Sequence, residues 1–208
     1  MIVEGIAPFE GFGENTNSFI SYLRSIYYRK HMARTFFSFL LISYAFAGFA
    51  QNKDIPALLQ VPQGSKLIMH TYAKGVQIYL CKQDSKDTSR YIWTFIAPHA
   101  NLYDDSRYHH LVGKHYFDAG KNPMWEAADG STVVGLKVQQ ANSPDSLAIP
   151  WLLLKMAATT GNGILTPVAF IQRIYTKGGK APATADRQHA GQTVEVPYTA
   201  EYLFYSGH

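Results

Sequence analysis

The sequence predicts an all-β protein, an antiparallel β-sandwich or barrel-like single domain of about eight to nine strands. Aromatic residues make up 14% of the 208 residues, with 14 Tyr and 12 Phe, and these residue types are enriched in strands. Short apolar or alternating runs recur along the chain, separated by Gly, Pro, Asn and Asp. Beyond the first fifty residues no segment shows a helical stripe over three turns, which argues against a doubly wound fold with alternating helices.

Eight runs have the composition of strands, since each is rich in Val, Ile, Tyr, Phe, Trp or Thr and is bounded by turn residues. They are Lys66–Tyr72, Val76–Lys82, Tyr91–Ala97, Leu111–Phe117, Val133–Gln139, Trp151–Met156, Val168–Thr176 and Glu195–Tyr205. We expect a tight turn at Lys74-Gly75 between the first two runs and a hairpin turn at Asp129-Gly130. A longer polar loop follows the seventh run and extends to Gln192.

Alternation along a strand decides which side chains share a face of the sheet. In the run at 111–117, His115 and Phe117 share one face, and Lys114 and Tyr116 share the other. In the run at 168–176, Arg173 shares a face with apolar side chains. We expect an arginine in such surroundings to lie at a sheet edge or to pair with a buried carboxylate. The carboxylates that could serve are Asp129, Glu126 and Glu201.

The residues before the first strand have the pattern of a secretory signal peptide. Basic residues Arg29, Lys30 and Arg34 precede the apolar run Phe36–Ala50, which ends in the small residues that signal peptidase reads. The run has 15 residues, fewer than the roughly 20 that a membrane-spanning helix needs. Met32 stands where the basic region of such a signal begins.

We therefore expect residues 1–31 to be a non-native upstream extension, residues 32–50 to be the signal peptide, and residues 51–208 to form a single β domain. This predicts a secreted or periplasmic protein that has no transmembrane span after cleavage following Ala50. The alternative is a segment that is not cleaved and stays as an N-terminal anchor.

Composition excludes several classes of partner and cofactor. The net charge of +4 is spread without a basic run, and charged residues make up only 16% of the chain, so nucleic acid is not an expected partner. A single cysteine excludes a disulfide scaffold within the chain and a zinc site with several cysteines. The stretches Gly11–Gly13 and Gly161–Gly163 lack the third glycine of a dinucleotide-binding turn, and we expect no cofactor.

Short motifs follow one another in a characteristic order from about Pro56 to Tyr205. They are Val61–Leu67, Ala73–Tyr79, Gly113–Tyr116, Trp125–Glu126, Asp129–Ser131, Ile149–Leu154, Ile171–Arg173 and Pro197–Tyr202. In this order they resemble the bacterial and fungal family called domain of unknown function 3455. The resemblance implies a secreted protein and assigns no activity.

The resemblance also bears on the single cysteine. Members of the family often carry a cysteine that matches Cys81 and a second cysteine in the late loop. Here that loop reads Ala183-Thr184-Ala185-Asp186, without a cysteine. We therefore expect Cys81 to be a free thiol that is buried as a small apolar side chain.

The candidate catalytic residues are His115, Asp129, Glu126 and Arg173. A histidine beside a carboxylate can transfer protons, and such a pair would serve a hydrolase or a lyase. The structural alternative places His115 in a hydrogen bond inside the sheet and Asp129 in an ordinary turn.

The candidate ligand-binding residues are Trp125, His115 and Tyr116. The indole of Trp125 offers an apolar platform for a sugar or another flat ligand. The structural alternative makes Trp125 a core residue.

Histidines cluster at His109, His110 and His115, and neutral imidazole is a common zinc ligand. Adjacent histidines on a strand would point to opposite faces, and no H-E-x-x-H motif is present. The neighbouring Asp104 and Asp105 belong to a loop, where we expect them to be solvated or in contact with calcium. We predict no metal site.

The absence of a recognisable catalytic set favours an exported binding or envelope-associated module. Its partner would be a small molecule, a glycan or a component of the envelope. The alternative is a secreted hydrolase or lyase that uses His115 with Asp129 or Glu126, and a third class is a structural or interaction protein.

The signal-peptide pattern predicts that the exported protein begins at Gln51. Sequencing the N-terminus of protein recovered from outside the cytoplasm measures this directly. A mature chain that still carries residues before Phe36 would contradict the prediction.

Overall fold

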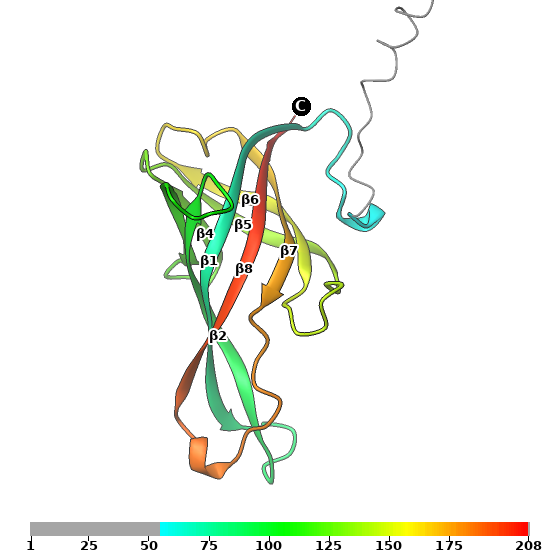
Figure 1. Ribbon diagram of the computed structural model, residues 1–208, viewed down its shortest axis with the longest axis vertical. Coiled ribbons are helices and arrows are strands. Elements are labelled where there is room, and N and C mark those ends of the chain that lie inside the picture. The colour runs from blue at the N-terminus through cyan, green and yellow to red at the C-terminus, as the bar shows by residue number, and fades with distance from the viewer. Residues whose placement is uncertain (1–54, 208) are drawn as a thin grey trace, which may run out of the picture. The chain divides into compact units, whose positions relative to one another are not determined.

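The computed structural model describes residues 55–207. Their eight antiparallel strands form one closed barrel, in which each strand pairs with the next along the chain and the last pairs with the first (Figure 1). This confirms the predicted all-β class. The expected upstream extension at 1–31 and signal peptide at 32–50 lie outside the described residues. Within the described part, no helix has the length and hydropathy required to cross a membrane.

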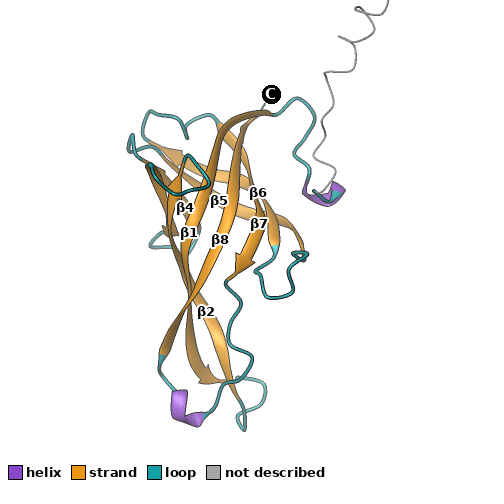
Figure 2. Cartoon of the chain, viewed as in Figure 1, coloured by secondary structure: helices purple, strands orange, loops and turns teal. Residues whose placement is uncertain are grey.

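The barrel contains strands of very different lengths, and two short 3-10 helices flank them (Figure 2). The strands are β1 (Lys66–Gln83), β2 (Tyr91–Tyr103), β3 (Leu111–Phe117), β4 (Pro123–Ala127), β5 (Thr132–Ala141), β6 (Trp151–Thr160), β7 (Val168–Gly178) and β8 (Thr193–Ser206). The 3-10 helices are η1 (Ala57–Leu59) and η2 (Arg187–His189). Six of the predicted runs match single strands, and most of these strands extend beyond the predicted ends.

Strand β4 has no counterpart among the predicted runs. It has only five residues and opens with Pro123, which a strand accommodates at its first position. Its end is marked by the Asp129-Gly130 turn, where Gly130 has φ +82° and the Ser131 carbonyl accepts from the Ala127 N–H. The hairpin turn was therefore predictable, whereas the short strand before it was not.

The predicted turn at Lys74-Gly75 is wrong, because β1 runs straight through these residues. Gly75 pairs with Ala100 of β2 on one side and with Tyr198 of β8 on the other. A Cβ atom at this position would collide with the His99 carbonyl oxygen and the Cα atom of Ala100. The glycine is thus required for the close approach of two strands, not for the conformation of a turn.

The barrel interior is filled by alternate residues of each strand. From β8 the inward side chains are Tyr198, Ala200, Tyr202 and Phe204, all of them buried. These residues belong to one large cluster of buried residues that also includes Trp125 of β4. Alternation of this kind places a dense apolar core inside the barrel.

A second cluster covers the outside of β6 and β7. Leu59 of η1 is fully buried there with Trp151, Leu153 and Ile174. The side-chain amide of Gln172, also buried, donates to the Leu59 carbonyl oxygen at 2.6 Å. The segment before β1 therefore belongs to the folded domain and covers an apolar outer face.

Strands β1, β2 and β8 continue beyond the other five as a three-stranded extension, the lower part of Figure 1. The late loop between β7 and β8 packs against this extension. Cys81 is free and buried, as expected, and its Sγ lies 3.6 Å from the Asp186 carbonyl oxygen. The loop at 183–186, which contains no cysteine, thus lies beside Cys81.

The close approach at Gly75 makes a specific prediction for stability. We expect Gly75→Ala to lower the free energy of unfolding by roughly 3 kcal/mol, since the added methyl group meets backbone atoms that cannot move independently. The matched control is Gly207→Ala, whose Cβ would make an ordinary 3.4 Å contact with Ala169. Urea unfolding measures both variants, and equal stabilities would contradict this role of Gly75.

Candidate functional site

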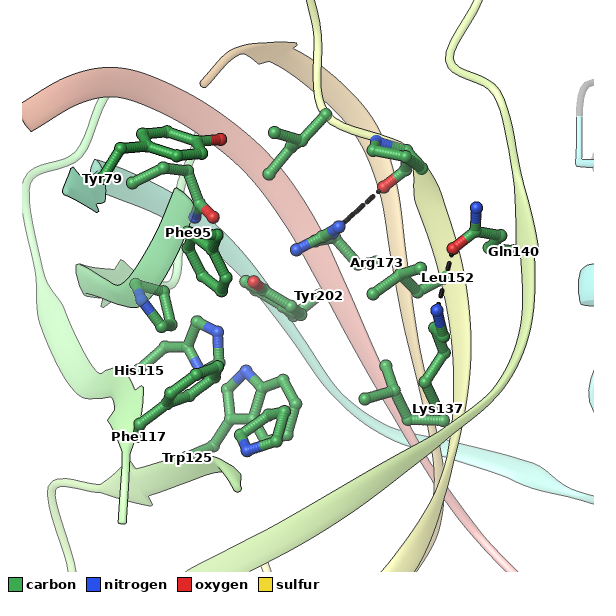
Figure 3. A pocket seen from close by; sticks show the side chains of 16 residues that line it. Tyr79, Phe95, His115, Phe117, Trp125, Lys137, Gln140, Leu152, Arg173 and Tyr202 are labelled. Atoms are coloured by element: carbon green, nitrogen blue, oxygen red, sulfur yellow. Dashed lines mark hydrogen bonds between the residues drawn. The ribbon is translucent and has the colours of Figure 1, made fainter. Parts of the chain in front are cut away.

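The barrel encloses a cavity of about 390 Å³, and every strand contributes at least one side chain to its wall (Figure 3). The wall is mainly apolar and aromatic. Its residues are Gln77, Tyr79, Phe95, Pro98, His115, Phe117, Pro123, Trp125, Lys137, Gln140, Ile149, Pro150, Leu152, Leu154, Arg173 and Tyr202. The exposed side chains among them, Phe95, Lys137 and Gln140, mark the open end of the cavity.

Arg173 extends from β7 into this cavity toward Tyr202, its neighbour on β8 (Figure 3). Its Nε and Nη2 donate to the Pro150 carbonyl oxygen at 3.2 and 2.9 Å. No carboxylate in the described part forms an ion pair with it. The expectation of a sheet edge or a buried carboxylate partner is therefore wrong, because a closed barrel has no edge and a backbone carbonyl takes the place of the carboxylate.

The three carboxylates considered as partners of Arg173 are all engaged elsewhere. Glu126 accepts a 2.6 Å hydrogen bond from the Tyr116 hydroxyl, and Glu201 lies 2.8 Å from His70 Nε2. Asp129 accepts from the Ser131 hydroxyl at 2.6 Å and from the Ile164 N–H at 2.8 Å. None of the three lines the cavity.

His115 is buried in the cavity wall and held in one tautomer. Its Nδ1 lies 2.9 Å from the Met124 carbonyl oxygen, so Nδ1 carries the proton and Nε2 keeps its lone pair. The imidazole stacks on the Trp125 indole, with ring centroids 4.4 Å apart and planes 12° apart. The structure thus joins His115 to Trp125 and Arg173, but not to Glu126 or Asp129.

Burial also sets the charge of His115. It lowers the pKa of the imidazole from 6.5 to about 3, and the positive charge of Arg173 acts in the same direction. The ring is therefore neutral at physiological pH. A group of such low basicity, with no carboxylate in reach, is poorly suited to general acid–base catalysis near pH 7.

Several buried polar groups in the wall lack a hydrogen-bond partner. They are the amide nitrogen of Gln77, the indole N–H of Trp125 and the hydroxyl of Tyr202, none of which makes a hydrogen bond of normal length. Gln77 and Tyr202 do lie near the Tyr198 hydroxyl, and Tyr202 lies near Arg173. The side chains of Gln77, Trp125 and Tyr202 are each at least nine-tenths buried and can donate a hydrogen bond. Buried donors are nearly always paired in folded proteins, so three open donors around one cavity indicate a place for an acceptor.

The candidate residues from the sequence fall into two groups. His115, Trp125 and Arg173 line the cavity, whereas Tyr116, Glu126 and Asp129 do not. Tyr116 and Glu126 bind each other, and this contact raises the pKa of the Tyr116 hydroxyl to about 12.

Sequence reasoning missed the contributions of Gln77, Lys137 and Tyr202 to the cavity wall. The alternation of side chains between the two faces of β8 would have been enough to predict that Tyr202 points into the barrel. The position of Lys137 depends on an irregular register between β5 and β6, which no local pattern reveals.

One cluster outside the cavity has metal-ligand chemistry. Atoms of Asp104, Asp105 and His110 lie within 4.8 Å of one another in the loop after β2. His110 is exposed, and its Nδ1 lies 3.6 Å from Asp104 and 3.9 Å from Asp105. These contacts account for the cluster as a group of charges on an exposed loop.

Comparison with known proteins identifies one relationship. The model of a family described as protein of unknown function (DUF3455) matches residues 62–206. Searches of the curated proteins and of the solved structures find no significant match.

The low pKa of His115 predicts a pH dependence of stability. Between pH 6.5 and about 3 the unfolded chain binds a proton that the folded chain excludes, so the free energy of unfolding falls as the pH falls. We expect the His115 contribution to decrease by about 2 kcal/mol between pH 7 and pH 5, a range in which carboxylates change little. Urea unfolding at both pH values measures the slope.

The variant His115→Gln should show a smaller slope, whereas the exposed-loop control His109→Gln should behave like the wild type. An NMR titration of the His115 ring tests the same cause without a variant. An imidazole that titrates near 6.5 would contradict the prediction.

Proposed function

The chain belongs to the family described as protein of unknown function (DUF3455), and we propose that it is a non-catalytic binding protein that holds a small molecule inside its barrel. The observation that carries this proposal is the cavity of about 390 Å³, with apolar walls and three buried donors that lack partners. Ligand sites in proteins combine such walls with a few convergent polar groups, and typical volumes run from about 300 to 1,000 Å³.

The walls supply more apolar than polar surface. Phe95 and Phe117 meet edge to face at 5.6 Å, and Tyr79 packs on Phe95 at the same centroid distance. Leu152 and Leu154 of β6 also line the cavity. A ligand with a flat or chain-like apolar body would lose water contacts on entering, which favours binding.

The strands also support binding through their rigidity. Tyr79 is fixed by a 2.6 Å hydrogen bond to the Gly179 carbonyl oxygen, and His115 is fixed by Met124 and Trp125. Side chains on paired strands need little reordering when a ligand arrives, so less free energy is spent on immobilising them.

Catalysis receives less support from the same residues. The described residues that line the cavity include no Asp, Glu, Ser, Thr or Cys. A hydrolase or lyase built on His115 would need a carboxylate beside it, and both candidate carboxylates have other partners. Binding of a ligand by the polar groups of the cavity does not require a carboxylate beside His115.

We also propose that the protein works after export, as a secreted or periplasmic module. The signal-peptide pattern at 32–50 supports this proposal.

The binding proposal predicts that the neutral dye N-phenyl-1-naphthylamine enters the barrel. Its fluorescence should rise with saturation as the wild-type protein is added. We expect Leu152→Trp, which fills the cavity, to weaken dye binding at least tenfold, about 1.4 kcal/mol. Leu136→Trp places the same side chain on the exposed surface of β5 and serves as the matched control.

Circular dichroism verifies that both variants keep the β-rich fold. The proposal is contradicted if the wild-type protein shows no saturable fluorescence, or if the two tryptophan variants bind the dye equally well.

A further inference from the structure

We propose, on the basis of the binding function above, that the natural ligand is a monoanion: a small carboxylate with a flat apolar body, whose carboxylate group binds Arg173 inside the barrel. Three features of the cavity support this ligand. They are its positive charge, the second edge of the Arg173 guanidinium and the hydrogen-bond donors near Arg173.

The charge balance of the cavity is positive. Arg173 and Lys137 are the cations among the described lining residues, and no acidic side chain accompanies them. Lys137 lies at the open end and donates to Gln140 Oε1 at 3.0 Å. Arg173 is part-buried in the apolar wall. A charge without a counter-ion is costly there, so an anionic ligand would stabilise it.

The guanidinium has one edge occupied and one edge free. Nε and Nη2 form the edge that donates to the Pro150 carbonyl oxygen. Among the described residues, the other edge, formed by Nη1 and Nη2, makes no further hydrogen bond of normal length, and the Tyr202 hydroxyl lies near the guanidinium. Two parallel N–H groups on one edge match the two oxygens of a carboxylate, which is the strongest common way for arginine to bind an anion.

The groups around Arg173 are suited to the same oxygens. Tyr202 is its direct cross-strand neighbour, and its buried hydroxyl makes no hydrogen bond of normal length. Burial raises the pKa of the Tyr202 hydroxyl, and the charge of Arg173 together with polar contacts to Tyr198 and Arg173 opposes that rise, so these three groups lie close together. Gln77 and Trp125 supply two further donors to the cavity wall, and a carboxylate oxygen of the ligand could accept from them.

The remainder of the wall suits a flat apolar body. Trp125 and His115 present stacked, parallel rings, and the neutral state of His115 avoids a second buried charge beside Arg173. A single free arginine edge matches a single carboxylate. A phosphate dianion would require further cations, and Lys137 at the mouth is engaged by Gln140.

The test uses a matched pair of ligands, 2-naphthoate and its neutral amide 2-naphthamide, at pH 7. Each displaces N-phenyl-1-naphthylamine from the protein, and the ratio of their dissociation constants is measured. We expect the wild-type protein to prefer the carboxylate at least about tenfold, as hydrogen bonds to a charged partner generally do. Arg173→Gln should bring the ratio close to one, whereas Arg107→Gln, in an exposed loop, should keep it.

The outcomes separate this inference from the binding function. If the dye binds but the amide competes as well as the carboxylate, the anion inference is overturned and the binding function stands. If the dye does not bind at all, both fail together. Should Arg173→Gln not fold, the wild-type ratio alone decides the preference for an anion, and Arg173→Lys, which keeps the charge but loses the planar edge, should reduce it.

Discussion

The pairing of β8 with β1 is the constraint on which the rest of the structure depends. It extends from Lys66 opposite Ser206 to Leu80 opposite Thr193, and it closes the sheet into a barrel. An eight-stranded barrel has an interior just wide enough to be filled by side chains or to hold one small ligand. In this protein large side chains fill part of the interior, and the remaining space forms the cavity.

Closure also explains how a charged residue comes to lie inside. In an open sheet, an arginine on an apolar face could reach water around an edge strand. In the barrel, Arg173 has only the interior available and is held there by the Pro150 carbonyl oxygen. The same closure removes Asp129, Glu126 and Glu201 from its reach, since each lies elsewhere in the fold with its own partner. The site is therefore a mainly apolar cavity whose arginine has no acidic partner.

Much of the fold was predictable because its signals are local. Aromatic and β-branched runs located most strands, and the Asp129-Gly130 turn located a hairpin. The turn predicted at Gly75 was wrong. A glycine between two strand-like runs usually marks a turn, whereas Gly75 allows the His99 carbonyl oxygen to approach β1 closely. The candidate site was half predictable. His115, Trp125 and Arg173 meet in the cavity, whereas Glu126 and Asp129, predicted as partners of His115, bind Tyr116 and Ser131 instead.

The sequence by itself determined the β class, the buried free state of Cys81 and which side chains of β3 share a face, because these follow from residue type and from the two-residue repeat of a strand. Only the tertiary structure decided that the sheet closes, that Lys137 and Tyr202 join the cavity, and that Arg173 has no acidic partner. Those features depend on strand register and on contacts between residues far apart in the chain, such as Arg173 and Pro150 or Gln77 and Val196. Local patterns of residues carry no information about such pairings, and the chemistry of the cavity arises from them.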